Sequence, residues 1–554
     1  MKEVEIYCKN TNTTRNYPLG TSLLEISEDL QVKLENMIVG AIVNNQIREL
    51  SFCMVKPKQI EFVDVSHPDG RRLYIRSLIF VLYAAVKKTF PEVCLKIQNG
   101  ISNGYFFELN GFGREITDSD VFAITQEMKS LIAADIPFIK KRMLTTEAIE
   151  LLKKQGLPEK ARLFEQQGNL FSSLYFLKDI ANYLYGHLLP STSYITNFGL
   201  IPYFNGILLQ VPRPKHFDKL HKLVERNKLF GIIQEQKDWA EILNVSSIGQ
   251  LNYFTLKGRS GDVIKVSEAL HEKKIAEIAN MIFARNGDLK IVLVSGPSAS
   301  GKTTFSKRLG IQLIVNGLRP RQISLDDYFV DREHTPLDEF GEYDFEALEA
   351  IDVGFFNHQL LELLEGREVE LPGFDFQTGK RKKSGKTLKL APKDILVVEG
   401  IHGMNPGLLP HIDRKYTFSI FISALTQIAF DEQTYISTAD NRILRRIIRD
   451  SKYRGYPAWE TIKRWPSVRR GEESNIFPHQ ENADIMFNSA TLYELGVLKK
   501  YAEPLLKQVP ENRGEFIEAN RLIQFLSWFK QIEDREIPPT SLLREFLGGS
   551  SFVY

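Results

Sequence analysis

Residues 291–307, with the sequence IVLVSGPSASGKTTFSK, decide the fold of this chain. The five apolar or small residues 291–295 predict a buried strand, and the apolar spacing further on predicts a helix over residues 304–318. Between them, residues 296–303 fit the pattern G-x-x-x-x-G-K-[ST] at every required position. Strand, glycine-rich loop and helix in this order form a site for the phosphates of a nucleoside triphosphate. A chance glycine-rich turn is the alternative.

The loop offers phosphate ligands of three kinds. Its backbone N–H groups turn inward, the helix N-terminus adds partial positive charge, and Lys302 reaches the outer phosphates. The hydroxyl of Thr303 is placed to ligate Mg²⁺. The residues expected to contact ATP are therefore Gly296, Ser298, Ala299, Ser300, Gly301, Lys302, Thr303 and Thr304.

Acidic residues end two of the strands that follow. Apolar runs alternate with helical patterns, which predicts a parallel α/β sheet with chemistry at the carboxyl ends of its strands. Asp326, after the strand in RQISLDD, is placed to take the proton of an attacking hydroxyl, or it is a helix cap or turn. Glu399 closes the strand in ILVVEG and is expected to support Mg²⁺, or it is a surface acid at a strand end.

Three further residues suit an acceptor molecule. Asp344, in EYDFEALEAID, is placed either to bind a sugar hydroxyl or to cap the next helix. Phe374 and Phe376, in PGFDF, are suited to flank a planar base. The basic run at residues 380–383 is expected to be a solvated loop.

An arginine-dense helix is predicted in NRILRRIIRDSKYRGYP, residues 441–457. Four of its arginines fall within one broad helical face. Such a helix before a Gly-Tyr-Pro break predicts a lid whose charges offset those of the transition state, and a nucleic-acid patch is the alternative. The arginines concerned are Arg442, Arg445, Arg446, Arg449 and, beyond the face, Arg454.

The segments GPSASGKTTF, ISLDDYF, YDFEAL, PGFDF, VVEGIHG and RRIIRDSKYRG occur in the order found in the uridine kinase and phosphoribulokinase group of P-loop kinases, and the chain resembles that group over about 200 residues. The resemblance implies ATP- and Mg²⁺-dependent phosphorylation of a nucleoside 5′-hydroxyl. It implies that Asp326 is the catalytic base, Asp344 binds ribose, and Glu399 associates with the metal. It further implies that the base lies between Phe374 and Phe376, and that the lid arginines are Arg446, Arg449 and Arg454.

This chain departs from the uridine kinase pattern at three positions. Gly379 stands where those enzymes place a histidine that reads the pyrimidine edge, Tyr456 replaces a lid arginine, and Arg464 replaces a glutamine that helps to hold the substrate. Uridine or cytidine is the leading acceptor by family frequency. Another sugar or a pantothenate-like alcohol is an alternative acceptor.

Residues 1–65 predict a small β-grasp domain. VEIYCK, MIVGAIVNNQIREL and IEFVDV read as strands around a helix that starts in GTSLLEIS. The segment resembles the TGS domain at the front of threonyl-tRNA synthetases and some GTPases, which implies a binding module without catalysis of its own.

Residues 66–225 resemble the editing-type domain of threonyl-tRNA synthetase, through HPDGRRLYIRSLIFVLYAAVKKTFPEV and GHLLPSTSYITNFGLIPYFNGILL. In that family the domain carries an HxxxH pair and a later Cys and His. Phe80, Ala84, Leu184 and Leu188 stand at those four positions, and none of them supplies a lone pair to a metal. His187 is more often a structural residue than a ligand in such a setting. Editing chemistry is therefore not expected.

The remaining divisions are a connector at 226–285, a kinase domain at 286–500 and a helical tail at 501–554. The connector is expected to contain a strand, LNYFTL, and to stop at Asn286-Gly287-Asp288. The expected fold is thus multidomain, α+β followed by α/β.

Composition sets the outer bounds. The chain has 554 residues with 43% hydrophobic residues and a formal net charge of +2, so bulk charge favours neither nucleic acid nor membrane. Cys8, Cys53 and Cys94 are expected to be small buried residues in a reducing compartment. No membrane span is expected, and the cytoplasm is the expected location. An oligomer and an RNA contact through the N-terminal domains are partner hypotheses. The competing function is an RNA-associated regulatory protein that uses ATP as a switch.

Overall fold

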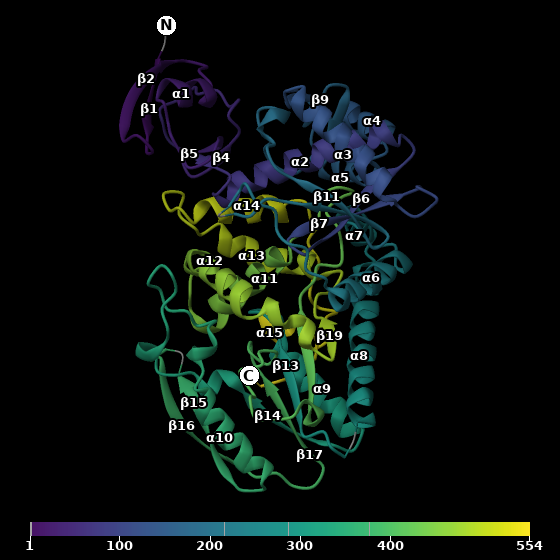
Figure 1. The fold of residues 1–554 in the computed structure, drawn as a ribbon, viewed down its shortest axis with the longest axis vertical. Helices are drawn as coiled ribbons and strands as arrows, with labels where there is room; N and C mark the ends of the chain where they lie inside the picture. The colour runs from purple at the N-terminus through teal and green to yellow at the C-terminus, as the bar shows by residue number, and fades with distance from the viewer. Residues whose placement is uncertain (1–2, 215, 286, 376, 554) are drawn as a thin grey trace.

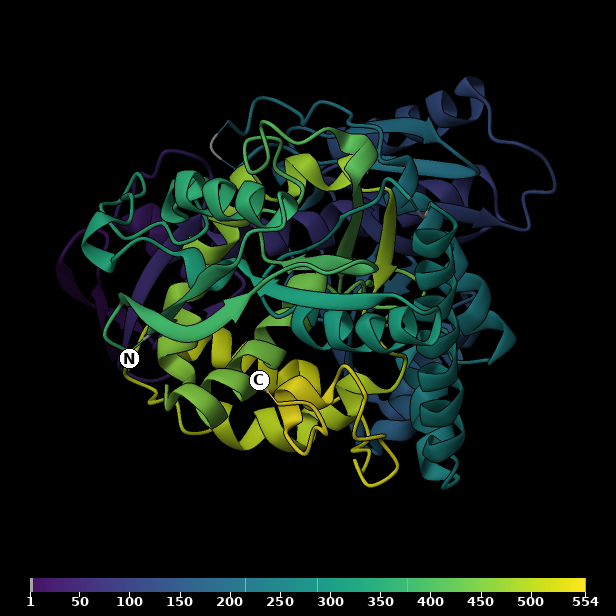
Figure 2. The ribbon, with the colours of Figure 1, turned by 90° about the horizontal axis from the view of Figure 1, so that it is seen from below.

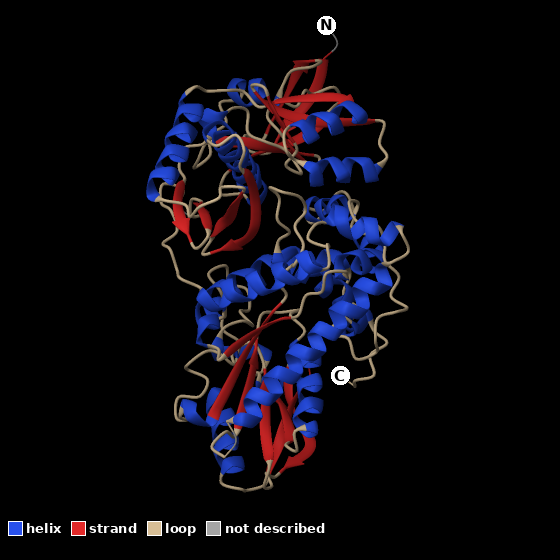
Figure 3. Cartoon of the chain, turned by 90° about the vertical axis from the view of Figure 1, so that its right-hand side faces the viewer, coloured by secondary structure: helices blue, strands red, loops and turns tan. Residues whose placement is uncertain are grey.

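The computed structural model describes residues 3–214, 216–285, 287–375 and 377–553. Two of the predicted residues, Asn286 and Phe376, lie outside the described residues. Strands occur at both ends of the molecule, and a mostly helical layer separates them (Figure 3).

The first sheet has five strands in the order β2-β1-β5-β3-β4. β1 pairs in parallel with β5 and antiparallel with β2, while α1 (Leu23–Asp29) begins at a capping box between Ser22 and Glu25. This arrangement confirms the predicted β-grasp fold. The strands are β1 (Glu3–Cys8), β2 (Thr13–Pro18), β3 (Ile38–Val43), β4 (Ile47–Arg48) and β5 (Lys58–Asp64).

The next region packs four helices against two antiparallel sheets, ordered β11-β12-β7-β6 and β10-β9-β8. The helices are α2 (Pro68–Thr89), α3 (Asp118–Ala133), α4 (Thr145–Lys154) and α5 (Pro158–Gln167). The strands are β6 (Cys94–Ile101), β7 (Gly104–Asn110), β8 (Ile139–Leu144), β9 (Phe171–Leu177), β10 (Ile180–Asn182), β11 (Gly199–Tyr203) and β12 (Gly206–Gln210).

Three helices follow, and one of them corrects a prediction. They are α6 (Asn227–Ile242), α7 (Ile248–Leu256) and α8 (Ser260–Ala284). LNYFTL is the second half of α7 and not a strand. The Ser247 side chain caps this helix by accepting from the Gln250 N–H, and Ile248 and Leu251 are buried one turn apart. Capping and helical spacing together outweigh the alternation of L, Y and T.

The third region is built on a parallel sheet in the order β14-β17-β13-β18-β19. α8 and α9 (Lys302–Val315) cover one face of it, and α10 (Val353–Leu364) contributes to the apolar cluster on the other (Figure 2). The predicted parallel sheet with flanking helices is confirmed. Its strands are β13 (Ile291–Ser295), β14 (Arg319–Ser324), β17 (Asp394–Glu399), β18 (Thr417–Ser423) and β19 (Ile485–Asn488).

A hairpin beside this sheet corrects a second prediction. It pairs β15 (Val369–Asp375) with β16 (Lys380–Leu388), so the basic run 380–383 lies in a strand and not in a loop. Cys53 is exposed and Cys94 is partly exposed, so only Cys8 matches the expectation of burial.

The helical layer between the two ends carries the arginine-dense segment (Figure 1). Its helices are α11 (Thr438–Arg449), α12 (Ala458–Asn475), α13 (Glu494–Leu506), α14 (Phe516–Leu526) and α15 (Arg544–Leu547). Within the described part of the chain, no helix combines the length and the apolarity needed to cross a bilayer.

Candidate active site

The phosphate loop joins β13 to α9 in a conformation that requires glycine at its start. Gly296 has φ of +154°, and a Cβ there would lie 2.1 Å from the carbonyl oxygen of Ile422 in β18. Gly301 has φ of +87° at the N-cap of α9. Gly296 therefore lets the loop pack closely against β18, and Gly301 gives the chain the left-handed conformation from which α9 begins.

A threonine hydroxyl and a carboxylate meet beside this loop. The Thr303 Oγ1 donates to Glu399 Oε1 at 3.1 Å, because β13 and β17 are neighbours in the sheet. The Ser324 hydroxyl donates to the same oxygen at 3.3 Å. Burial, with the charges of Asp326 and Glu545, raises the pKa of Glu399 to about 7, and Lys302 acts in the opposite direction. Oxygen donors of this kind suit Mg²⁺. The sequence had not singled out Ser324.

Asp326 lies at the carboxyl end of β14, in a short 3-10 turn (Leu325–Tyr328). Its backbone N–H donates to Ser324 Oγ at 3.3 Å, so it occupies a capped turn, and its side chain is half-buried. The negative charge of Asp326 acts on Lys302, Glu399 and Arg454, which places its carboxylate at the phosphate loop and not in the packed interior.

Lys302 lies within the same cluster. Its Nζ donates to the Pro297 carbonyl oxygen at 3.1 Å. Burial lowers the pKa of Lys302, while Glu399, Asp326 and Glu545 raise it. Lys302 thus faces three carboxylates, and the positive charge of Arg449 also acts on it. A bound nucleotide and its metal ion would change the balance of these charges.

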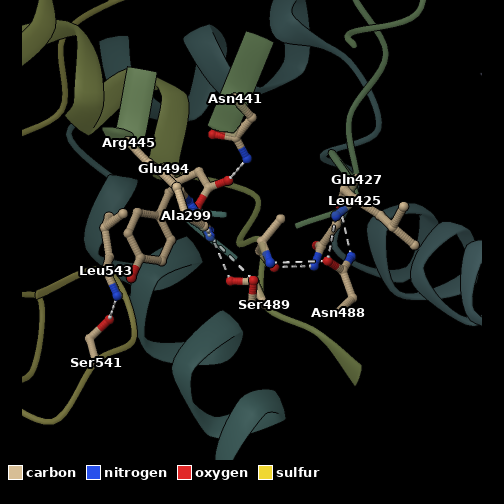
Figure 4. Close-up of polar contacts among 12 residues, drawn as sticks. Ala299, Leu425, Gln427, Asn441, Arg445, Asn488, Ser489, Glu494, Ser541 and Leu543 are labelled. Carbon is tan, nitrogen blue, oxygen red and sulfur yellow. Dashed lines mark hydrogen bonds and ion pairs between the residues drawn. The ribbon is translucent and has the colours of Figure 1, made fainter. Parts of the chain in front are cut away.

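Two of the predicted lid arginines instead support the loop from behind. Arg442 is buried, bonds the Ser298 carbonyl oxygen at 3.0 Å and pairs with Glu472 at 2.7 Å. Arg445 bonds the Ala299 carbonyl oxygen at 3.3 Å and pairs with Glu494 beside Ser489 (Figure 4). The prediction that these two face a ligand is wrong, because the same helical face also packs on the loop backbone.

The other three arginines converge on one carboxylate. Arg446, Arg449 and Arg454 lie 3.3, 3.0 and 3.4 Å from Asp450. Burial alone would raise the pKa of Asp450, but these three guanidinium groups hold it below its usual value. Arg446 also donates to the Ser298 hydroxyl at 3.1 Å. These arginines therefore lie together at the loop, with Asp450 as their common anchor.

Carboxylates occupy two loop N–H groups that were expected to bind phosphate. Glu472 of α12 accepts from the Ser298 N–H at 3.0 Å. Glu545 of α15 accepts from the Thr304 N–H at 3.2 Å and from its hydroxyl at 2.7 Å. No local sequence signal marks these two glutamates, since each is more than 150 residues away from its partner.

On the acceptor side, Asp344 lies in a turn against α12. Its Oδ1 accepts from the Glu346 N–H at 3.1 Å, and a Cβ at Gly471 would come 3.2 Å from that oxygen. It is not a helix cap, since the caps of the next two helical segments are Ala347 and Asp352. Burial raises the pKa of Asp344.

Phe374 packs beside Phe329 with ring centroids 5.6 Å apart. Gly379, at the position where the family pattern has histidine, has φ of +71°, and a Cβ there would lie 2.7 Å from Arg332 Nε. Arg332 therefore fills the space beside that position.

The comparisons with known proteins divide the chain in two. Residues 291–494 match the model of a family described as "Phosphoribulokinase / Uridine kinase family". A uridine kinase of Staphylococcus epidermidis is 31% identical over 198 residues, which are 35% of this chain and 86% of that protein. A solved structure described as a possible uridine kinase from Bacillus stearothermophilus is 21% identical, covers 39% of this chain and 98% of that chain, and has a TM-score of 0.27.

The N-terminal region matches a different group of proteins. A threonine–tRNA ligase of Syntrophomonas wolfei is 31% identical over 179 residues, which are 32% of this chain and 28% of the ligase. The chain thus spans less than a third of the length of this ligase. The predicted fusion of a threonyl-tRNA synthetase-like region to a P-loop kinase is confirmed.

Proposed function

We propose, from the premise that this chain belongs to the phosphoribulokinase and uridine kinase family, that it transfers the γ-phosphoryl group of ATP to the 5′-hydroxyl of a nucleoside, uridine or cytidine first among them. The observation that carries the proposal is the convergence of Lys302, Thr303, Glu399 and Asp326 at one end of the parallel sheet. Phosphoryl transfer depends on positioning and charge stabilisation, and this cluster supplies both.

Each residue has a separate role in this proposal. Lys302 and the loop amides bind the β- and γ-phosphates, and Asp326 accepts the proton of the attacking hydroxyl. Thr303 and Glu399 would hold Mg²⁺, which neutralises charge on the phosphate oxygens. Arg446, Arg449 and Arg454 close over the phosphates. To do so, all three must exchange the Asp450 carboxylate for phosphate oxygens.

The acceptor site differs in one respect from the family pattern. Asp344 is proposed to bind the ribose and Phe374 and Phe376 to flank the base. Because Arg332 lies against Gly379, a guanidinium group and not an imidazole would face the base edge there. The acceptors to be tested should therefore include compounds other than pyrimidine nucleosides.

The front of the chain is proposed to have no editing activity. Residues 1–65 are proposed to be a TGS-like module and residues 66–225 an editing-like domain without metal ligands. RNA is the partner that the threonine–tRNA ligase likeness suggests for them.

An ATP-consumption screen tests the proposal. The full chain is incubated with Mg²⁺·ATP and each nucleoside in turn, or with non-nucleoside alcohols, with and without added transfer RNA. Phosphorylated nucleoside is expected in the absence of RNA. ATP consumption that requires RNA and yields no phosphorylated acceptor would contradict the kinase and support the RNA-associated switch. Transfer to a non-nucleoside alcohol alone would keep the kinase and change the acceptor.

A further inference from the structure

A cavity of about 710 Å³ lies between the N-terminal region and the helices behind the phosphate loop. Its walls come from α2 on one side and from α11, α12 and α14 on the other, and these elements adjoin in the middle of the molecule (Figure 1). The proposed catalytic residues Lys302, Asp326 and Glu399 do not line it. Its volume lies within the range of small-molecule sites in proteins.

The lining of this cavity is rich in positive charge. Six cationic side chains line it, against four carboxylates. Arg72 and Arg521 are compensated, because both pair with Glu518, at 3.2 and 2.6 Å. The six cations are Arg71, Arg72, Arg76, Lys463, Arg469 and Arg521.

Arg76 is the exception among these arginines. Among the described residues it has no carboxylate within ion-pair distance, and its guanidinium lies 5.9 Å from the ring centre of Tyr185. Burial, together with the neighbouring charges of Arg72 and Arg521, lowers the pKa of Arg76 to about 10, although Tyr185 and Asp69 act in the opposite direction. Arg76 is half-buried, and only the more distant Asp69 charge favours its cationic form. A partly desolvated cation without an ion-pair partner costs stability, and an anion bound in the cavity would offset that cost.

Arg71 adds a second cation of the same kind. It lies on the same helix, and its guanidinium donates to the Pro212 carbonyl oxygen at 2.7 Å. Burial lowers the pKa of Arg71 as well. Arginine donors suit the paired oxygens of phosphate.

Aromatic side chains share the cavity with these arginines. Tyr185 and Phe430 lie with ring centroids 5.0 Å apart, and Tyr105 and Tyr435 lie 5.4 Å apart. Trp465 of α12 and Phe525 of α14 complete the aromatic lining. Such rings stack on planar heterocycles.

We propose that this cavity is a second ligand site, for a phosphorylated ring-bearing small molecule of the nucleoside phosphate class. Arg76 and Arg71 bind the phosphate, and the aromatic side chains contact the ring. The site is separate from the phosphate loop and does not depend on which acceptor the kinase uses.

The cavity also has a short structural connection to the phosphate loop. Arg469 lines the cavity and donates to Glu472 at 3.2 Å, and Glu472 accepts from the Ser298 N–H of the loop. Trp465 lies under Arg442, 5.3 Å from its guanidinium carbon, and Arg442 bonds the loop backbone. A ligand that moves Arg469 or Trp465 would therefore change the loop geometry, so occupancy is expected to alter the affinity for ATP.

Calorimetric titration tests the binding. The background is Lys302→Ala, in which triphosphate binding at the loop is weakened so that the second site dominates. The probes are uridine 5′-triphosphate, uridine 5′-monophosphate, uridine, ribose 5-phosphate, inorganic phosphate and transfer RNA. Uridine mono- and triphosphate are expected to bind at one site per chain. Adding Arg76→Met should weaken that binding at least tenfold, and adding Arg259→Gln, an exposed arginine at the start of α8, should not.

Thermal unfolding separates a ligand anchor from a structural residue. Because Arg76 has no ion-pair partner among the described residues, Arg76→Met should raise the unfolding midpoint without ligand and abolish the rise that uridine monophosphate produces. A lowered midpoint with unchanged ligand binding would overturn the proposal. So would the absence of binding by every phosphorylated nucleoside, ribose 5-phosphate binding as tightly as uridine monophosphate, or binding of transfer RNA alone.

Kinetics tests the connection to the loop. In the chain with Lys302 intact, uridine monophosphate is expected to change the KM for ATP at least threefold beyond the product inhibition that remains in Arg76→Met. Identical KM values in the two proteins across the titration would refute this part of the proposal.

Discussion

The N-terminal region and the kinase region differ in which residues stand at the positions where a functional site is expected. At the four positions where the synthetase likeness would place metal ligands, Phe80, Ala84, Leu184 and Leu188 are at most 2% exposed and belong to one apolar core. In the kinase region, half-buried polar residues converge at the end of a sheet instead. A fold can therefore keep its packing when a site loses its polar groups. Similarity of fold alone does not show that an activity is present.

The sharpest test of this contrast is Asp326→Asn. Turnover should fall by about 10²- to 10⁴-fold, because the amide cannot accept the proton of the acceptor hydroxyl. ATP affinity and the unfolding midpoint should change little, since the side chain is half-buried and supports no core. Steady-state kinetics and calorimetry measure the two effects. Turnover at the wild-type rate would remove Asp326 from the mechanism.

Leu188→Ala should show the reverse pattern in the N-terminal region. Truncation of this buried side chain should lower the free energy of unfolding by about 2–5 kcal/mol, with kcat unchanged below the melting range. Denaturant unfolding provides the measurement. Leu170→Ala, at a residue that is 72% exposed, is the matched control and should cost less than about 0.5 kcal/mol. A large loss of kcat in folded Leu188→Ala would break the contrast between the regions.

Proton binding by Glu399 gives a smaller effect with a definite sign. The pKa of Glu399 in the folded chain is about 7, above its usual 4.5, so the folded state holds this proton more tightly than the unfolded state does. Its contribution to stability is full below pH 4.5 and is lost as pH rises through 7. Relative to Glu399→Gln, the ligand-free wild type should lose about 1–2 kcal/mol across that window, after allowance for partial exposure. Unfolding of both proteins from pH 4.5 to 8 measures the difference, and a constant difference would contradict the assignment.

Glu545→Gln should have the smallest effect. The Glu545 carboxylate competes with phosphate for the Thr304 N–H, so its neutralisation should lower the KM for ATP by about two- to fivefold. Glu536→Gln, a change at a partly exposed residue of the same C-terminal segment that pairs with Lys265 and not with the loop, should leave the KM unchanged. A raised KM in Glu545→Gln would mean that the carboxylate helps to shape the loop.

Local signals predicted much of the kinase site. The strand of residues 291–295 and the loop that follows were predictable because apolar run, glycines and helix are consecutive in the chain. Glu399 was predictable because it ends a run of buried residues. LNYFTL was predicted as a strand but is helical. The signal for the helix, its cap at Ser247, lies before this segment.

Contacts between segments that lie far apart in the chain could not be predicted from the sequence. Arg442 and Arg445 share a helix with Arg446 and Arg449, and only the tertiary structure shows that the first two are buried against Glu472 and Glu494. The same holds for Glu545, whose role depends on a return of the chain across 241 residues. Periodicity specifies a helix face but not the element that it meets.

The packing of the C-terminal segment on the kinase sheet determines how far the chain can be shortened. Leu542 belongs to the same apolar cluster as Phe305 and Ile420, and the Ser541 hydroxyl bonds Glu268 of α8 at 2.6 Å. An expressed fragment limited to residues 291–494 would leave that flank of the sheet uncovered and prone to aggregate. The shortest stable kinase fragment should therefore begin before α8 and extend through α15.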